Sequence, residues 1–183
     1  MIYNMHTNHS QKGFTLLETL VAISILLIAV VAPMSIIGRS LPQSAYARDH
    51  AIAVNLAQEG IEAVRQKRDS NMLNDWNGTN TAWDSGIVAN NYYAVDPRSV
   101  PMLISCGGVV CNLTTLTIRQ DTATGLYYQS SAGGGTVTKF QRYVLITSIV
   151  PEEKRIDSYV FWRDSMNISH TLSITGFIAG INS

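Results

Sequence analysis

The sequence is short of charge, and the charge it has is unevenly placed. Lysine plus arginine and aspartate plus glutamate each number 13 in 183 residues, so the formal net charge is zero. A balanced chain offers no general electrostatic attraction to nucleic acid or to a strongly acidic substrate. No charged side chain occurs from Thr19 to Gly38. We therefore predict no nucleic-acid partner, and the uncharged stretch has the length of a helix that spans a lipid bilayer.

Residue types for metal binding and catalysis are also few. The chain has two cysteines and four scattered histidines. Two cysteine ligands without a second pair or clustered histidines do not complete a tetrahedral zinc site. The sequence contains no nucleophile elbow, phosphate-binding loop or dinucleotide fingerprint. We expect no catalytic residue, no metal site and no cofactor, and hence a protein that is not an enzyme.

The two cysteines, Cys106 and Cys111, are separated by a Gly-Gly-Val-Val segment whose glycines permit a tight loop. Disulfides form outside the cytoplasm, where the surroundings are oxidising. Cys106 and Cys111 are therefore a candidate disulfide if this part of the chain lies outside the cytoplasm, and a pair of free thiols if it does not.

In the segment KGFTLLETLVAISILLIAVVAP, residues 12–33, a single acidic residue, Glu18, precedes a long apolar run. Two ordinary interpretations of this segment are a secretory signal and a permanent membrane anchor. A secretory signal would be cut at the small-x-small site 45–47. Its hydrophobic region would be shorter than the run from Leu20 to Ile37, and it would be wholly apolar where this chain has Glu18. A permanent single-pass anchor would use Thr15 and Glu18 as a helix capping box. The anchor leaves the Lys12-Gly13 pair unexplained.

In a third interpretation, residues 1–13 are a leader that is removed, so that Phe14 becomes the N-terminus. Glu18 then lies one helical turn from a free amine. In a bundle of related helices, Glu18 meets the amine of a neighbour. This partner matters because a charge in hydrocarbon costs on the order of 3 kcal/mol or more.

Gly13, Phe14 and Glu18, within KGFTLLETLVAISIL, resemble the class III signal peptide of the type IV pilin and pseudopilin superfamily. The resemblance implies cleavage after Gly13 by a prepilin peptidase, N-methylation of Phe14, and pairing of Glu18 with a neighbouring subunit's N-terminus during assembly. The helix end at residues 53–71 is similar to that of PilV-like minor pilins and type II secretion pseudopilins. The expected partners are other pilin or pseudopilin subunits, an inner-membrane assembly platform and the lipid bilayer.

The rest of the chain predicts an α+β fold, in which a long N-terminal helix packs on a C-terminal antiparallel sheet. Small and apolar residues from Ala53 to Val64 recur at helical spacing and form one stripe. Pro33 and Pro42 predict a bend or a local interruption of the helix. Five later segments are rich in β-branched and aromatic residues and predict strands: 114–119, 126–129, 139–150, 156–163 and 168–178.

These patterns divide the chain into four parts. We expect a cleaved leader at 1–13, a transmembrane and assembly helix at 14–38, an amphipathic continuation at 39–68, and a globular head at 69–183. Within the head, residues 69–113 are rich in Asn, Gly and Ser and predict mostly loop with short strands, while 114–183 predict the sheet. Trp76 and Trp83 are expected to cover a small core.

The sequence thus favours a structural subunit, a minor pilin or pseudopilin, of a type IV pilus or a secretion filament. It would be held in the cytoplasmic membrane by one span, with its head outside the cytoplasm. The alternative is a membrane-anchored extracytoplasmic binding or enzyme domain whose anchor is never cleaved.

Overall fold

The computed structural model of the chain describes residues 13, 15–130, 132 and 134–180, with the backbone alone at 32 and 35–41. The chain divides into two compact units, residues 1–45 and 46–183. The elements, in chain order, are α1 (Leu16–Asn74), the π-helical turn η1 (Asp75–Thr79), β1 (Asn91–Val95), β2 (Leu103–Ser105), α2 (Leu113–Leu116), β3 (Thr117–Gln120), β4 (Tyr127–Tyr128), β5 (Thr136–Val150), β6 (Glu153–Arg163) and β7 (Ser169–Ala179).

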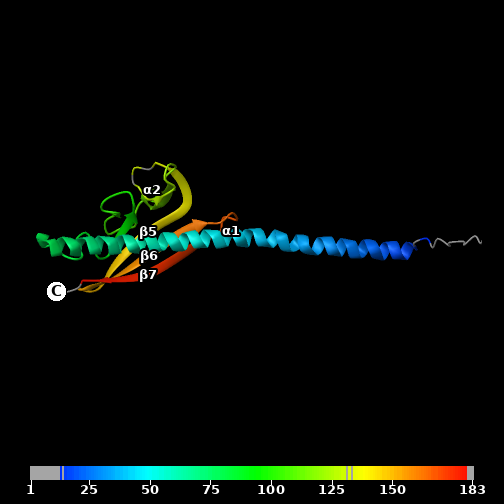
Figure 1. The fold of residues 1–183 in the computed structure, drawn as a ribbon, viewed down its shortest axis with the longest axis horizontal. Helices are drawn as coiled ribbons and strands as arrows, with labels where there is room; N and C mark the ends of the chain where they lie inside the picture. Colours follow the sequence, from blue (N-terminus) through cyan, green and yellow to red (C-terminus); the bar gives the residue numbers. More distant parts are fainter. Residues whose placement is uncertain (1–12, 14, 131, 133, 181–183) are drawn as a thin grey trace, which may run out of the picture. The chain divides into compact units, whose positions relative to one another are not determined.

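The α+β class predicted from the sequence is confirmed, since an N-terminal helix precedes a C-terminal antiparallel sheet. In the second unit, α1 from residue 46 onward lies beside β5, β6 and β7 (Figure 1). The structure does not show the other feature expected from the sequence, a helix that spans the membrane. Among the described residues, no helix is both long and apolar enough to cross a membrane.

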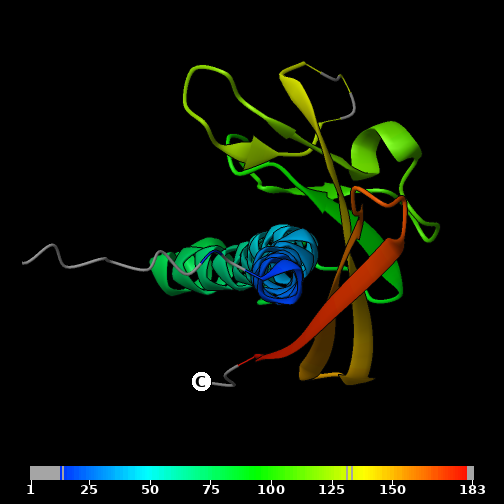
Figure 2. The same cartoon turned by 90° about the vertical axis from the view of Figure 1, so that its right-hand side faces the viewer.

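The sheet is organised around β5, the longest strand. One edge of β5 pairs with β6, which in turn pairs with β7. The other edge pairs with β1 near the middle of β5 and with β3 near its start, and the short strands β2 and β4 extend these two branches. All these pairings are antiparallel. Figure 2 shows the curved β5 and β6 side by side, with β7 beside them.

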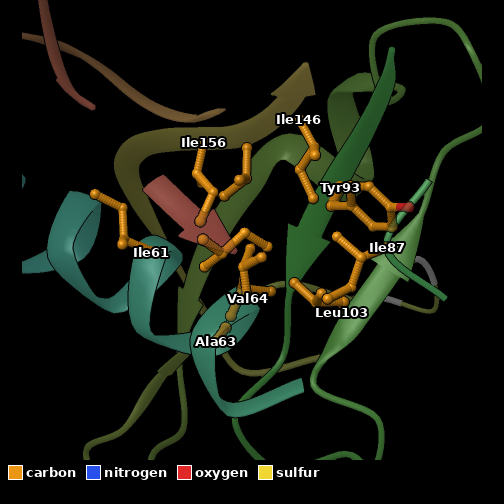
Figure 3. Close-up of a cluster of buried hydrophobic side chains, with 11 residues drawn as sticks. Ile61, Ala63, Val64, Ile87, Tyr93, Leu103, Ile146 and Ile156 are labelled. Carbon is orange, nitrogen blue, oxygen red and sulfur yellow. The ribbon is translucent and has the colours of Figure 1, made fainter. Parts of the chain in front are cut away.

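The core of the second unit lies between α1 and the inner face of the sheet. The predicted stripe is buried as expected, with Ala53, Ala57 and Val64 fully inaccessible. One cluster joins Ile61 and Val64 of α1 to residues of β1, β5 and β6, among them Ile146 and Ile156 (Figure 3). A second cluster joins the start of the stripe to Phe140, Val160 and Trp162. Burial of this apolar surface is the main force that holds the helix on the sheet.

The helix is longer and more regular than the sequence predicts. Pro33 and Pro42 both lie inside α1, so the predicted interruption is absent from the described backbone. A proline inside a helix removes one hydrogen bond and disfavours helix, but it does not end α1 here. At the other end, α1 stops at Asn74 rather than Arg68, so part of the segment predicted as loop is helical.

The strand predictions differ from the structure mainly at their ends. β5, β6 and β7 lie where predicted, with boundaries shifted by up to three residues. The segment predicted as strand at 114–119 begins as the helical turn α2, because Asn112 caps it by accepting a hydrogen bond from the Thr115 amide at 2.9 Å. Trp83 packs against the core as expected, whereas Trp76 is 88% exposed and covers nothing.

Candidate functional site

The predicted processing and assembly residues lie at the start of α1, in the first unit. Gly13 precedes the helix and is exposed, and Phe14 lies outside the described residues. Glu18 is in the first helical turn, with its side chain exposed. A carboxylate at this position interacts favourably with the helix macrodipole. Glu18 is therefore accessible to a second chain.

Thr15 supplies the helix cap in front of Glu18. Its hydroxyl Oγ1 accepts a hydrogen bond from the backbone amide of Glu18 at 3.3 Å, and its carbonyl accepts from the same amide at 3.0 Å. This is the threonine half of the capping box. The cap fixes where the helix begins, and so it fixes the position of the Glu18 carboxylate.

The helix surface around Glu18 is apolar and uncovered. Every leucine, isoleucine, valine and methionine from Leu16 to Met34 is exposed, by between 47% and 83%. Soluble monomers seldom leave so much apolar surface in contact with water. The hydroxyls of Thr19 and Ser24 donate to the carbonyls of Leu16 and Leu20 at 2.9 and 2.8 Å, which removes two polar groups from this surface. The surface is suited to contact with lipid tails or with other helices.

In the second unit, Arg142 is the central polar residue, and it is completely buried. Its Nη1 donates to the Glu59 carboxylate and to the Leu56 carbonyl of α1, both at 2.8 Å. Its Nη2 donates to the Val95 carbonyl of β1 at 3.2 Å. Burial lowers the pKa of Arg142, and the nearby charge of Glu59 opposes that effect. Arg142 therefore ties α1 to both β5 and β1.

Gln129 completes this network from the segment after β4. Its Oε1 accepts from Arg142 Nε at 3.0 Å and from the Val95 amide at 3.0 Å. Its Nε2 donates to the carbonyls of Thr115, Leu116 and Arg142. Because each buried polar atom of Gln129 finds a partner, the network satisfies groups that would otherwise be costly to bury.

Sequence reasoning missed both Arg142 and Gln129. Arg142 sits at an inward position of β5 between Phe140 and Val144, where the alternation of the strand calls for an apolar residue. A single charge on the apolar face of a predicted strand is the signal that could have identified it.

The candidate disulfide residues are joined in the structure. Cys106 and Cys111 form a disulfide with a Cα–Cα distance of 5.0 Å, and it closes the loop between β2 and α2. Within the described parts of the chain, no cluster of three or more side chains suited to metal binding occurs.

A second polar cluster lies at the turn between β6 and β7. The Asp164 carboxylate faces His170 Nε2 at 3.0 Å and accepts from the amides of Met166 and Ile168 at 2.9 Å. The bond to His170 and these amides together hold the pKa of Asp164 below its ordinary value. The His170 ring stacks on Trp162, with centroids 5.3 Å apart. This cluster fixes the turn and one end of the sheet.

Comparison with known proteins identifies one part of the chain. Residues 8–32 match the family model of the prokaryotic N-terminal methylation motif. No curated protein and no solved structure matches the chain. The matched range contains Gly13, Phe14 and Glu18, the residues singled out from the sequence. The chain thus carries at its start the class III signal peptide of type IV pilins and pseudopilins.

Proposed function

We propose that this protein is a structural subunit, a minor pilin or pseudopilin, of a type IV pilus or a type II secretion-like filament, and not an enzyme. The observation that carries the proposal is the methylation motif at residues 8–32. The exposed apolar surface from Leu16 to Met34 supports it, because that surface needs lipid or other helices to cover it.

The proposed maturation has two steps. A prepilin peptidase cleaves after Gly13, and the new amine of Phe14 is methylated. The first part of the chain then divides into a leader at 1–13 and an assembly helix at 14–38 that is held in the cytoplasmic membrane. The helix continues at 39–68, and the head, 69–183, lies outside the cytoplasm. The disulfide between Cys106 and Cys111 supports a location of the head outside the cytoplasm, because disulfides persist in oxidising surroundings.

The proposed assembly step is a charge pairing between subunits. The carboxylate of Glu18 meets the N-terminal amine of a neighbour as the subunit leaves the bilayer and the assembly platform. An unpaired charge in hydrocarbon costs on the order of 3 kcal/mol or more. Pairing removes much of this cost for both charges and fixes the register between neighbouring helices.

The mature N-terminus tests the maturation. We expect mass spectrometry of the protein purified from membranes to show loss of residues 1–13 and one added methyl group on Phe14. Intact Met1 would instead support an uncleaved anchor that carries a binding or enzyme domain. A chain that starts at Arg48 would indicate an ordinary secretory signal.

The variant Glu18→Ala tests the assembly step. Processing and membrane insertion should be unchanged, while incorporation into filaments should fall at least about tenfold, since the neighbour's amine loses its partner. Immunoblots of sheared filaments against whole membranes measure this ratio.

Glu62→Ala is the matched control for Glu18→Ala. It is the same substitution on the same helix, at an exposed glutamate that pairs with Arg65 on the surface. Such pairs contribute little, so incorporation should stay at the wild-type level. Normal incorporation of Glu18→Ala would rule out the pairing mechanism.

A further inference from the structure

A hollow of about 470 Å³ opens at one end of the three long strands of the head. Its lining includes Lys139 and Gln141 of β5, Phe161 and Arg163 of β6, and Thr171 of β7. In the sheet register, Gln141 is opposite Phe161, and Phe161 is opposite Thr171. The hollow is therefore built on neighbouring strands of one rigid sheet. Its volume lies within the range of small-ligand sites, about 300 to 1,000 Å³.

The charge of this hollow is one-sided. Lys139 and Arg163 both line it, and no carboxylate does. Lys139 Nζ is paired with Asp49 of α1. Arg163 is exposed, and its Nη1 donates to the neutral amide oxygen of Asn167 at 3.1 Å. In the described part of the chain, no carboxylate pairs with Arg163. A guanidinium that no carboxylate already occupies can bind a ligand carboxylate through two parallel hydrogen bonds.

One wall of the hollow is aromatic and continues beyond it. Phe161 lies 5.5 Å from Tyr143 and 6.4 Å from Tyr159, measured between ring centroids, and it is stacked on Tyr159. All three rings are only partly buried. Beside them, Gln141 and Thr171 supply an amide and a hydroxyl. A purely apolar ligand would leave these polar groups without partners, which costs binding free energy.

These features together match a carboxylated sugar. A sugar ring has an apolar face that packs on an aromatic ring, hydroxyls around its edge, and in a hexuronate one planar carboxylate. A single-stranded nucleic acid also stacks on aromatic rings, but it needs a track of cations along its backbone. Of the described residues that line the hollow, Lys139 and Arg163 are the permanent cations, and Lys139 is already paired.

We propose that this hollow binds a hexuronate unit of an acidic oligosaccharide. The ring packs on Phe161, the hydroxyls bond to Gln141 and Thr171, and the carboxylate is held by Arg163. The head is then a ligand-binding domain, whatever the N-terminal helix assembles into, so this inference does not depend on the proposed filament function.

Titration calorimetry of the full-length protein in detergent micelles tests the proposal, with tetragalacturonate as the ligand. Its methyl ester is the neutral comparison, because it has the same rings without the charge. We expect the acid to bind at least about tenfold more tightly than the ester, as a charge-assisted contact should give. A ligand concentration of about 10 mM detects dissociation constants of that order. If the acid does not bind at this concentration, the proposal is overturned.

Two variants and a control make the test specific. Arg163→Gln should reduce the affinity for the acid to that for the ester, and Phe161→Leu should weaken both ligands by a similar factor. Arg155→Gln is the control, because Arg155 lies on the same strand but pairs with Asp157 away from the hollow. The affinity of the Arg155→Gln variant for the acid should stay within about twofold of the wild-type value. An Arg163→Gln variant that binds like wild type, or equal binding of a polyglutamate of the same charge, would refute the sugar site.

Discussion

At the scale of single residues, Arg142 shows how a fully buried charge is accommodated. Its guanidinium bonds to Glu59, to two backbone carbonyls and to Gln129, so its donors are shared among three separate segments of the chain. Removing one member of such a network leaves the other buried groups unpaired, and this is usually more costly than the net gain from forming the network. Arg142 therefore contributes more to specifying the fold than its single charge suggests.

We expect Arg142→Met to lower the free energy of unfolding by about 3 kcal/mol. The apolar substitute fills similar space, but the carbonyls of Leu56 and Val95 and the Gln129 side chain lose a donor. Urea titration followed by tryptophan fluorescence measures the change. In Arg65→Met, the control, a surface pair with Glu62 is lost, and the expected change is under about 1 kcal/mol. Equal effects of the two variants would show that the buried network is not special.

At the scale of elements, the close packing of α1 on the sheet depends on one glycine. A Cβ on Gly60 would lie 2.5 Å from Ser158 Oγ of β6 and 3.0 Å from Val144 Cγ2 of β5. Real Cβ atoms essentially never approach another atom at the first of these distances, so a side chain here forces the Ser158 hydroxyl, the helix or the strand to move. Gly60 thus sets how near α1 approaches β5 and β6.

Gly60→Ala should therefore destabilise the head by about 1 kcal/mol or more, although alanine favours helix by about 1 kcal/mol over glycine. The same substitution in a Ser158→Ala background should cost clearly less, because the nearest atom is gone. Ser158 Oγ is buried without a partner in the described chain, so Ser158→Ala alone should be nearly neutral. A double-mutant cycle measured by thermal unfolding reports the coupling. Additive effects would contradict the contact.

The elements also show what sequence reasoning can and cannot reach. The stripe from Ala53 to Val64 and the strands β5 to β7 were predictable because their periodicity follows directly from burial on one side. The positions of β1 and β2 were not predictable, because short strands were expected in the segment 69–113 but its Asn, Gly and Ser residues show no sustained period. Arg142 was missed because periodicity treats charge as a mark of the solvent side. At the N-terminus, Gly13, Phe14 and Glu18 were identified because a processing signal is read from local sequence, without the fold.

At the scale of the whole molecule, two partly buried carboxylates, Asp164 and Asp121, make the head sensitive to acid. The bond to His170 lowers the pKa of Asp164, as do the amides of Ile168 and Met166. Hydrogen bonds from the backbone amides of Thr124 and Ala123 lower the pKa of Asp121. A carboxylate with a depressed pKa in the folded state stabilises the fold above its unfolded pKa, near 4. That stabilisation is lost as the pH falls through the folded value.

We therefore expect Asp164→Asn and Asp121→Asn to lower the unfolding midpoint at pH 7, and the difference from wild type to shrink as the pH falls below about 4. In that range wild type becomes protonated and loses the same interactions. Thermal unfolding measured from pH 7 to pH 2 provides the comparison. A difference that does not change with pH would mean that the variants act by altering packing and not by removing the charge.

The Cys106–Cys111 bond joins residues only five positions apart, in the loop between β2 and α2. Its loss would free one small loop, while the helix and the sheet would keep their own contacts. Because closing so short a loop contributes only a small part of the stability of the head, we expect the helix and the sheet to fold with Cys106 and Cys111 still reduced.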